Sequence, residues 1–214
     1  NFKGLEPISD EYTKPGLVKY GTPLVMPKFE KAGYDVFFAT VSVNMPAEDK
    51  SFEVSIIPKS NIPYKFVYMY EDAERDENGN VTYSMEREID CKGTAGDFVD
   101  GSLISKTAPQ GFEYVGFAEG TTINGDGSTV VNVYFDRKLY ELSYDFAGGI
   151  IREGVEYSKP GYYRYGQKIH LPTTGGAEPE LTFPGAISYG PNNGGDKIMP
   201  ASDYDVEYLV YYPD

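Results

Sequence analysis

The side chains that most often carry catalysis or bind metals are scarce in this sequence. Among 214 residues there is one histidine, His170, and one cysteine, Cys91. They cannot build a site of four cysteines, of paired cysteines and histidines, or of three histidines, and they leave one candidate for each catalytic role that usually uses them. The sequence therefore argues against metal and triad enzymology. We expect no metal site, no cofactor and no catalytic residue.

His170 and Cys91 can also be explained as structural residues. His170 stands between two apolar residues of a predicted strand, with no motif around it, so we interpret it as structural. Cys91 precedes a lysine, and a nearby lysine can lower the pKa of a thiol. Without a second signal we assign the thiol no redox or nucleophilic role. Catalysis within this chain would require a deep pocket lined by Asp and Glu that holds one of these two residues.

Acidic residues gather in two polar segments. Asp72, Glu74, Asp76 and Glu77 run into the sequence ENGN, and Asp126 lies in NGDGS. Oxygen ligands of this kind bind calcium, but neither segment has the spacing of a calcium loop with its distal glutamate. We interpret both segments as turns. No cleft for the paired carboxylates of a glycosidase can be inferred.

Aromatic rows are the best candidates for ligand binding. The chain has 20 tyrosines, and a tyrosine ring stacks on a sugar while its hydroxyl stays hydrated. Aromatic residues also form strands and pack on half-buried sheets, and this structural interpretation carries more weight. One row is formed by Tyr64, Tyr68 and Tyr70, and a second by Tyr208, Tyr211 and Tyr212. The loop 173–197 suits a specific contact, although its interpretation as a solvated insertion without function carries more weight. Our candidate ligand-binding residues are Tyr64, Tyr68, Tyr70, Tyr189, Asn192 and Asn193.

The charge of the chain restricts its partners. Lys and Arg number 19 against 33 Asp and Glu, which gives a net charge of −14. Such a chain repels phosphate backbones, so nucleic acid is excluded as a partner. No stretch approaches 18 apolar residues, so we expect no membrane insertion.

Two segments of the chain repeat each other. Residues 11–27 align with residues 156–172 without a gap, and eight positions are identical. Further on, residues 45–54 align with 199–208, so the second copy has nine extra residues, which fall in the loop 173–197. The second copy opens with a predicted strand at 139–149, whose counterpart would precede residue 1. Either the chain is cut inside a longer array or the first copy is a degenerate cap, and both predict an open sheet edge.

A different unit separates the copies. Residues 64–70 alternate as a strand with an aromatic face, the DENGN run predicts a hairpin, and residues 81–85 resume a period of two. Glu86 and Glu88 flank Arg87, which predicts a solvated edge. The segment 96–111 fits a short helix or an irregular crossover. Residues 130–135 are apolar on both faces, as in a central strand.

These motifs resemble two module families of Gram-positive bacterial surfaces. Residues 64–138 resemble a mucin-binding-protein (MucBP-type) repeat through PYKFVYMYED, GFEYVGFAEGTTI and DGSTVVNVYFDR. Residues 139–214, and in shortened form 1–57, are similar to the internalin B-repeat, or Listeria–Bacteroides repeat. LSYDFAGG, RYGQKIHLP and MPASDYDVEY carry this likeness, together with KYGTPLVMPKFEKAGYDVF and MPAEDKSFEV in the first copy.

The resemblance implies a mostly β (α+β) fold of small β-grasp-like modules in an elongated series. We expect a partial module without its first strand at 1–58, a MucBP-like module at 59–138, and a B-repeat-like module at 139–214 with an insertion at about 173–198. The Pro-containing link 56–64 predicts a semi-rigid joint. The second joint, FDRKLYEL, predicts a direct run from strand to strand.

The same resemblance implies a function. It indicates a non-enzymatic adhesin or stalk at the bacterial cell surface, held to the wall by other parts of the protein. Its partners would be a host glycoprotein or glycan, such as mucin, and neighbouring modules of the same chain. The alternative is an accessory region, a spacer or carbohydrate-binding part of a larger secreted enzyme. Further repeats in the reading frame favour the first interpretation, and a hydrolase domain favours the second.

Overall fold

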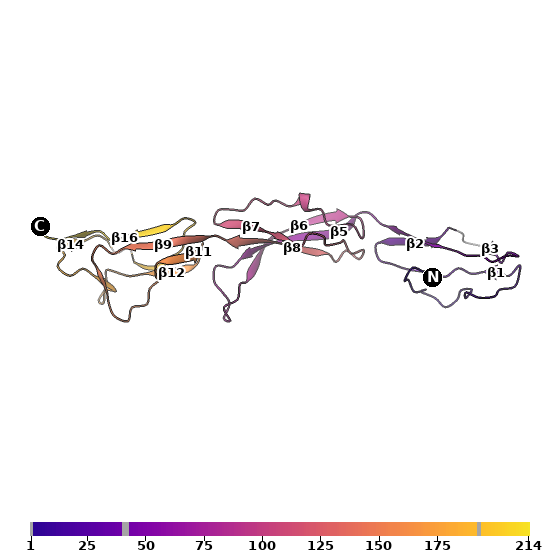
Figure 1. Cartoon of the computed structure of the whole chain (residues 1–214), viewed down its shortest axis with the longest axis horizontal. Helices are drawn as coiled ribbons and strands as arrows, with labels where there is room; N and C mark the ends of the chain where they lie inside the picture. The colour runs from indigo at the N-terminus through magenta and orange to yellow at the C-terminus, as the bar shows by residue number, and fades with distance from the viewer. Residues whose placement is uncertain (1, 40–42, 192–193) are drawn as a thin grey trace. The chain divides into compact units, whose positions relative to one another are not determined.

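The regular secondary structure of the chain consists almost entirely of β-strands joined by loops (Figure 1). The computed structural model describes residues 2–39, 43–191 and 194–214. Within these ranges the helical element is a 3₁₀ turn, η1 (Gly101–Leu103), where the Oδ1 atom of Asp100 accepts a hydrogen bond from Ser102 N at 2.9 Å. The predicted mostly β class is confirmed. The segment 96–111 forms an irregular crossover rather than an α-helix, because few apolar residues stand at helical spacing between its glycines and prolines.

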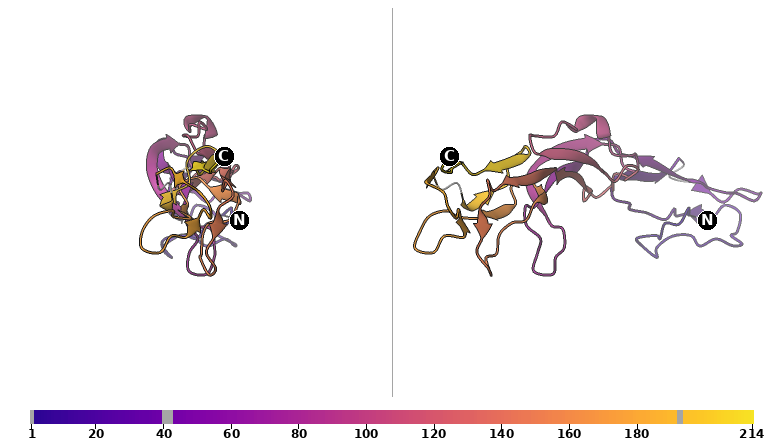
Figure 2. Two further views of the ribbon diagram at one scale, coloured as in Figure 1. Left: turned by 90° about the vertical axis from the view of Figure 1, so that its left-hand side faces the viewer. Right: turned by 60° about the vertical axis from the view of Figure 1, so that its left-hand side comes forward.

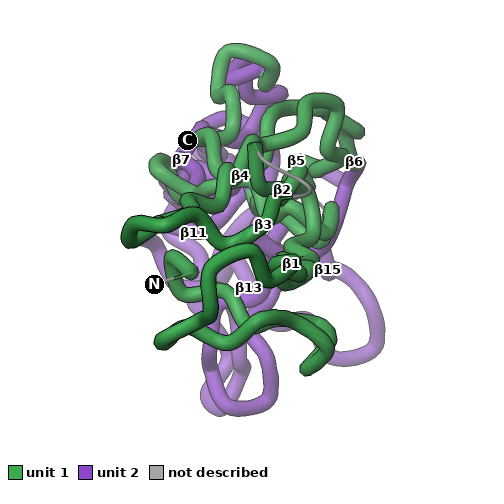
Figure 3. Tube along the Cα trace, turned by 90° about the vertical axis from the view of Figure 1, so that its right-hand side faces the viewer, with its two compact units in different colours: residues 1–67, 88–104, 118–132 green, residues 68–87, 105–117, 133–214 purple. Residues whose placement is uncertain are grey.

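The chain divides into two compact units (Figure 3). The first unit holds residues 1–67, 88–104 and 118–132, and the second holds 68–87, 105–117 and 133–214. The boundary passes through the long strands of the central sheet. Each unit therefore contains part of that sheet together with one end of the chain.

The central sheet has four strands in the order β6-β5-β8-β7. As the alternating residues predict, β5 and β6 are neighbours, β8 lies in the interior of the sheet and β6 lies at its edge. Glu86, Arg87 and Glu88 are exposed on that edge. The β7–β8 pairing is antiparallel, with an irregularity between Tyr114 and Gly116. The strands are β5 (Ile62–Glu71), β6 (Tyr83–Gly93), β7 (Phe112–Phe117) and β8 (Val130–Arg137).

A long polar turn joins β5 to β6. The Oδ1 atom of Asp76 accepts hydrogen bonds from Asn78 N and Asn80 N, at 2.9 and 2.7 Å, and Gly79 has a positive φ of 82°. Aspartate, asparagine and glycine favour such a turn, since short polar side chains bond to the local backbone and glycine adopts left-handed angles freely. The turn projects as an arm from its strands, purple in the right-hand view of Figure 2.

The C-terminal part of the second unit is built around β9 (Leu139–Asp145). This strand pairs antiparallel with β11 (Gly161–Arg164) and parallel with β16 (Tyr204–Glu207). Three two-stranded antiparallel ladders complete the region: β10 (Ile150–Ile151) with β13 (Leu181–Thr182), β12 (Lys168–Leu171) with β15 (Gly195–Ile198), and β14 (Ser188–Tyr189) with β17 (Val210–Tyr211).

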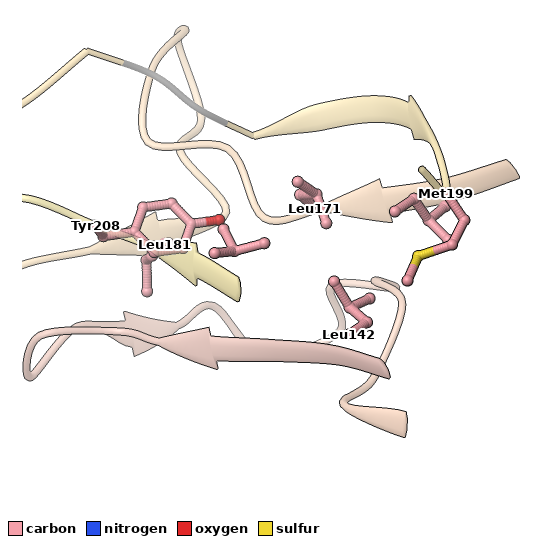
Figure 4. Close-up of a cluster of buried hydrophobic side chains, with 7 residues drawn as sticks. Leu142, Leu171, Leu181, Met199 and Tyr208 are labelled. Atoms are coloured by element: carbon pink, nitrogen blue, oxygen red, sulfur yellow. The ribbon is translucent and has the colours of Figure 1, made fainter. Parts of the chain in front are cut away.

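These strands enclose one apolar core (Figure 4). Leu142, at the middle of β9, is fully buried, and the side chains around it point toward one another. The alternation that the sequence shows along β9 thus places its apolar face on the other strands, as expected for a period of two. The buried members are Leu142, Ile169, Leu171, Leu181, Met199, Val206 and Tyr208.

The N-terminal part of the first unit has only short strands in its described residues. β1 (Pro23–Leu24) pairs with β3 (Val43–Asn44), and β2 (Tyr34–Phe38) pairs with β4 (Val54–Pro58), both antiparallel. Its buried core consists of Phe29, Phe38 and Val54. Phe2 and Phe52 pack on this core while remaining partly exposed.

The aligned segments 11–27 and 156–172 make the same hydrogen bonds. Thr13 N donates to Val25 O, and Val25 N donates back to the hydroxyl of Thr13; Ser158 and His170 repeat both bonds. The β1–β3 register pairs Leu24 with Val43, and the β12–β15 register pairs the counterparts Ile169 and Lys197. Gly21 N bonds to Met45 O, and correspondingly Gly166 N to Met199 O. The two segments that align in sequence therefore also share their main-chain hydrogen bonds.

Candidate functional site

Two of the candidate tyrosines lie in the interior. The side chains of Tyr64 and Tyr68 are 3% and 1% exposed. The hydroxyl of Tyr64 accepts a hydrogen bond from Asp100 N at 3.2 Å, and that of Tyr68 accepts one from Ser105 N at 2.8 Å. Their prediction as a sugar-binding platform is wrong, because the crossover segment bonds to both hydroxyls and the rings are buried. The alternative interpretation, that they are strand-forming core residues, fits these contacts.

Tyr70 lies at the wall of a surface groove. This groove has a volume of about 550 Å³ and is lined by Tyr70, Arg87, Phe112 and Arg137, among others. The Tyr70 ring packs edge-on against Phe112, with 4.9 Å between centroids. An aromatic wall beside two guanidinium groups suits a polar ligand with an apolar face. Of the row on β5, Tyr70 is therefore the tyrosine that borders a groove.

The remaining candidates lie in the insertion. Tyr189 is 52% exposed and packs its ring on Phe183 at 5.4 Å. Asn192 and Asn193 lie outside the described residues. Of the second row, Tyr208 is buried and its hydroxyl donates to Pro172 O, whereas Tyr211 and Tyr212 are exposed.

His170 is held between two carboxylates. Its Nδ1 atom lies 2.7 Å from an oxygen of Asp196, and its Nε2 atom lies 2.9 Å from an oxygen of Glu180. The hydrogen bond with Asp196, followed by that with Glu180, raises the pKa of the imidazole, because both partners favour its charged form. His170 lines a surface groove of about 670 Å³ with Glu156 and Asp196.

The arrangement around His170 is a clamp on the insertion. Glu180 also accepts a hydrogen bond from Thr173 N at 2.9 Å, so the carboxylate ties the start of the loop to β12. Asp196 lies at the end of the loop, on β15. Both ring nitrogens are engaged, which supports the structural interpretation of this histidine. The sequence did not indicate these partners, since they lie 10 and 26 residues away.

Cys91 lies inside the first unit and is 8% exposed. Burial raises the pKa of its thiol, and this effect outweighs the hydrogen bond with Tyr64 that opposes it. The adjacent lysine therefore does not activate the thiol. A raised pKa keeps a thiol protonated near neutral pH and hence weakly nucleophilic.

The carboxylates of the two acidic segments accept local hydrogen bonds that stabilise the turns in which they lie. Asp72 accepts hydrogen bonds at 2.6 Å from the hydroxyls of Ser84 and Thr82, which lower the pKa of its carboxyl. The carboxylate of Asp126 accepts from the hydroxyl and main-chain N–H of Ser128. Across residues 2–39, 43–191 and 194–214, no group of three or more His, Cys, Asp or Glu side chains is arranged to hold a metal ion.

A buried ionic network joins β8 to β9, and sequence reasoning did not single it out. β8 ends at Arg137 and β9 begins at Leu139, so Lys138 alone separates them. Beside this point Glu71 is 6% exposed. Its carboxylate accepts a hydrogen bond from Arg75 at 2.9 Å and another from the main-chain N–H of Arg137 at 2.8 Å.

Arg137 extends this network toward the C-terminal strands. Its Nε atom donates to Glu71 O at 2.7 Å, and one Nη atom donates to Tyr165 O at 2.9 Å. Its guanidinium carbon lies 4.8 Å from the centre of the Phe112 ring. Arg164 donates to Ala73 O at 3.1 Å. One buried acid and two arginines thus fix the end of β8, the start of the polar turn and β11 together.

Main-chain bonds support the same junction. Lys138 N donates to Gly111 O, and Tyr165 N donates to Lys138 O, both at 2.9 Å. Glu74, a candidate calcium ligand by composition, instead accepts a hydrogen bond from Lys168 N at 2.7 Å. The predicted direct run from strand to strand is therefore observed, and it is braced on both sides.

The Pro-containing link makes fewer polar contacts. Lys59 N donates to Gly33 O at 2.8 Å, and Ala95 N donates to Lys59 O at 3.1 Å. Asn61 adopts a positive φ of 62°. This link lies within the first unit and lacks a buried ion pair among the described contacts.

Comparison with known protein families and with curated proteins found no match for this chain. Among the described residues, no helix has the length and apolar character needed to cross a membrane.

Proposed function

We propose that the chain is a non-enzymatic segment of a bacterial cell-surface adhesin or stalk, in which small β-grasp-like modules follow one another in series. The observation that carries this proposal is the junction at Lys138. A joint of one residue, braced by a buried carboxylate and arginine side chains, resists bending because each movement breaks hydrogen bonds that Arg137 and Arg164 make to main-chain oxygens. Such a joint suits a protein that holds a binding module at a distance.

Two further observations support the proposal. The matched hydrogen bonds of segments 11–27 and 156–172 agree with a duplicated module, and arrays of modules extend a chain by repetition. The two residues most suited to nucleophilic or acid–base chemistry have structural surroundings: Cys91 is buried, and both ring nitrogens of His170 are engaged. Net charge of −14 keeps such an array soluble.

Small-angle scattering of the whole chain tests the stalk. A single compact domain of this length has a radius of gyration of about 17 Å. Modules in series are expected to give a clearly larger radius and a long tail in the distance distribution. Glu71→Ala is expected to broaden that distribution by loosening the junction, whereas the control Glu113→Ala, at an exposed position on β7, is expected to leave it unchanged. A compact profile for the native chain would refute the serial arrangement.

The groove beside Tyr70 is the surface that we propose for a host glycan or mucin glycoprotein. Its aromatic wall suits the apolar face of a sugar, and the arginines and carboxylates of its lining, Arg87 and Glu86 among them, suit the hydroxyl groups. Arg87→Gln is expected to weaken binding of immobilised mucin, while Arg152→Gln, at an exposed ion pair with Glu178, is expected to leave it intact. Absence of mucin binding by the native chain, combined with an extended scattering profile, would leave the role of a spacer.

A further inference from the structure

The first unit contains a turn with the same geometry as the turn that follows β9 in the second unit. Phe146 O accepts a hydrogen bond from Gly149 N at 2.8 Å, directly after β9, and Phe2 O accepts one from Leu5 N at 3.0 Å. The intervening residues have matching left-handed angles: Ala147 and Gly148 have φ of 47° and 80°, and Lys3 and Gly4 have 53° and 79°. Phe2 is thus the counterpart of Phe146, the residue that directly follows β9.

In the second unit β9 fills a place between two strands. It bonds antiparallel to β11 and parallel to β16, and Leu142 is fully buried among the other core residues. The alignment gives the counterparts of β11 and β16 as residues 16–19 and 50–53. Neither segment takes part in a strand ladder in the first unit. Gly16 nevertheless has nearly the same positive φ as its counterpart Gly161, 147° against 152°.

The residues that would surround the strand are left partly exposed. In the second unit, four residues that pack against Leu142 and its neighbours are at most 4% exposed. They are Ile169, Leu171, Met199 and Val206. Their counterparts in the first unit are only half-buried, and all of them line one groove of about 350 Å³. The groove also includes residues of both unpaired segments. The counterparts are Leu24, Met26, Met45 and Phe52, and the other wall residues include Gly16, Val18, Lys50 and Ser51.

We propose that this groove is an acceptor site for a β-strand, and that its occupant is an extended segment joined directly to the turn at Phe2. Such a strand would run antiparallel to residues 16–19 and parallel to 50–53. Its large apolar side chain would stand four residues ahead of Phe2, as Leu142 stands ahead of Phe146, and would contact Leu24, Met26 and Phe52. The fit is specific because main-chain bonding sets the register and alternate side chains fill the groove. This proposal does not depend on adhesin activity.

The test adds the strand to the whole chain. The sequence Leu139–Tyr144 is fused ahead of Asn1, so that Asn1 takes the place of Asp145, and amide hydrogen exchange is followed by mass spectrometry. Exchange at residues 16–19 and 50–53 is expected to slow by at least tenfold, because their amides enter a ladder. The control carries the same extension with asparagine in place of its leucine, and is expected to slow exchange less than twofold. Exchange at residues 204–207 serves as the internal reference.

Three outcomes would overturn the proposal. Unchanged exchange at 16–19 and 50–53 in the fused chain would show that the groove does not accept a strand. Protection by the free peptide Leu139–Phe146, without protection by the fusion, would show that the strand comes from another chain rather than from the turn at Phe2. Equal protection by the asparagine control would show that the apolar side chains of the groove do not select the strand.

Discussion

Glu71 and Arg137 hold each other by reciprocal hydrogen bonds. The carboxylate of Glu71 accepts from the main-chain N–H of Arg137 at 2.8 Å, and the side chain of Arg137 donates to the main-chain oxygen of Glu71 at 2.7 Å. Each residue therefore bonds to the backbone of the other, so the ends of β5 and β8 are fixed in position. The second arm of Arg137 carries this restraint to Tyr165.

Removal of the buried carboxylate should destabilise this junction. Glu71→Ala is expected to lower the free energy of unfolding by about 3 kcal/mol, because it leaves the main-chain N–H of Arg137 and the guanidinium of Arg75 without their carboxylate acceptor. Glu71→Gln keeps an acceptor oxygen and should cost less. Urea denaturation measures both. The control Glu113→Ala should stay within about 0.5 kcal/mol of the native chain, as is usual at exposed positions. Equal effects at the two positions would show that the network is not stabilising.

The start of β7 packs closely on the C-terminal strands. Gly111 has a φ of 83°, and a Cβ atom there would overlap the ring of Tyr165. Gly120 has nearly the same φ, 84°, but faces open space. Both alanine variants pay for the left-handed backbone angle, and only Gly111→Ala also displaces a ring. Gly111→Ala is therefore expected to lose about 1–3 kcal/mol more than Gly120→Ala in urea denaturation. Similar losses would mean that Tyr165 moves aside freely.

The strands were accessible to sequence reasoning because their signal is local. The alternation of β9, the turn residues between β5 and β6, and the apolar β8 each predict an element that the structure contains. Burial of Tyr64 and Tyr68 was not accessible, since the same alternation describes an exposed aromatic face and a covered one. Only the crossover at Asp100 and Ser105 decides between them.

The polar networks were not accessible for a different reason. Glu71 and Arg137 are 66 residues apart, and a glutamate at the end of a strand has the same local pattern whether it is solvated or buried. His170 likewise gains its partners only when the insertion folds back. A single acid ending a strongly aromatic strand, and an arginine ending a central one, were the signals available. They would have placed both residues at one sheet end without pairing them.

The single cysteine permits an unambiguous test of burial. Cys91 is 8% exposed and its thiol pKa is raised by burial. Reaction with a thiol reagent at pH 8 is expected to be roughly 100-fold slower in the native chain than in urea, because the thiolate is both rare and covered. The urea-denatured chain should release one equivalent of product. Rapid reaction of the native chain would contradict the buried position.

The single histidine gives a direct view of the insertion clamp. The imidazole pKa in the folded chain should lie above 6.5, because Asp196 and Glu180 both favour the charged ring. A chain with one histidine gives one set of imidazole signals in NMR, so its titration needs no assignment to a residue. Asp196→Asn and Glu180→Gln should each lower the pKa. A native pKa at or below 6.5 would contradict the two short contacts.

The same linkage predicts how stability depends on pH. A raised folded-state pKa means that the contribution of His170 is complete below about 6.5 and is lost as the pH rises through the folded value. Burial opposes ionisation of Glu180, but the Thr173 N–H and His170 lower its pKa below 4.5, so its contribution is lost as the pH falls through that lower value. The clamp should therefore be strongest between about pH 4.5 and 6.5. His170→Asn should flatten the decline in stability above that window.

Salt should distinguish the contributions of Asp196 and Glu180 to the pKa of His170. The side chain of Asp196 is 93% exposed and that of Glu180 is 21% exposed. Exposed charges are screened by salt more than covered ones, so 0.5 M NaCl should lower the imidazole pKa more in Glu180→Gln, where Asp196 remains, than in Asp196→Asn, where Glu180 remains. Equal sensitivity in both variants would show that the insertion does not shield Glu180, and that the loop is not held against β12 in solution.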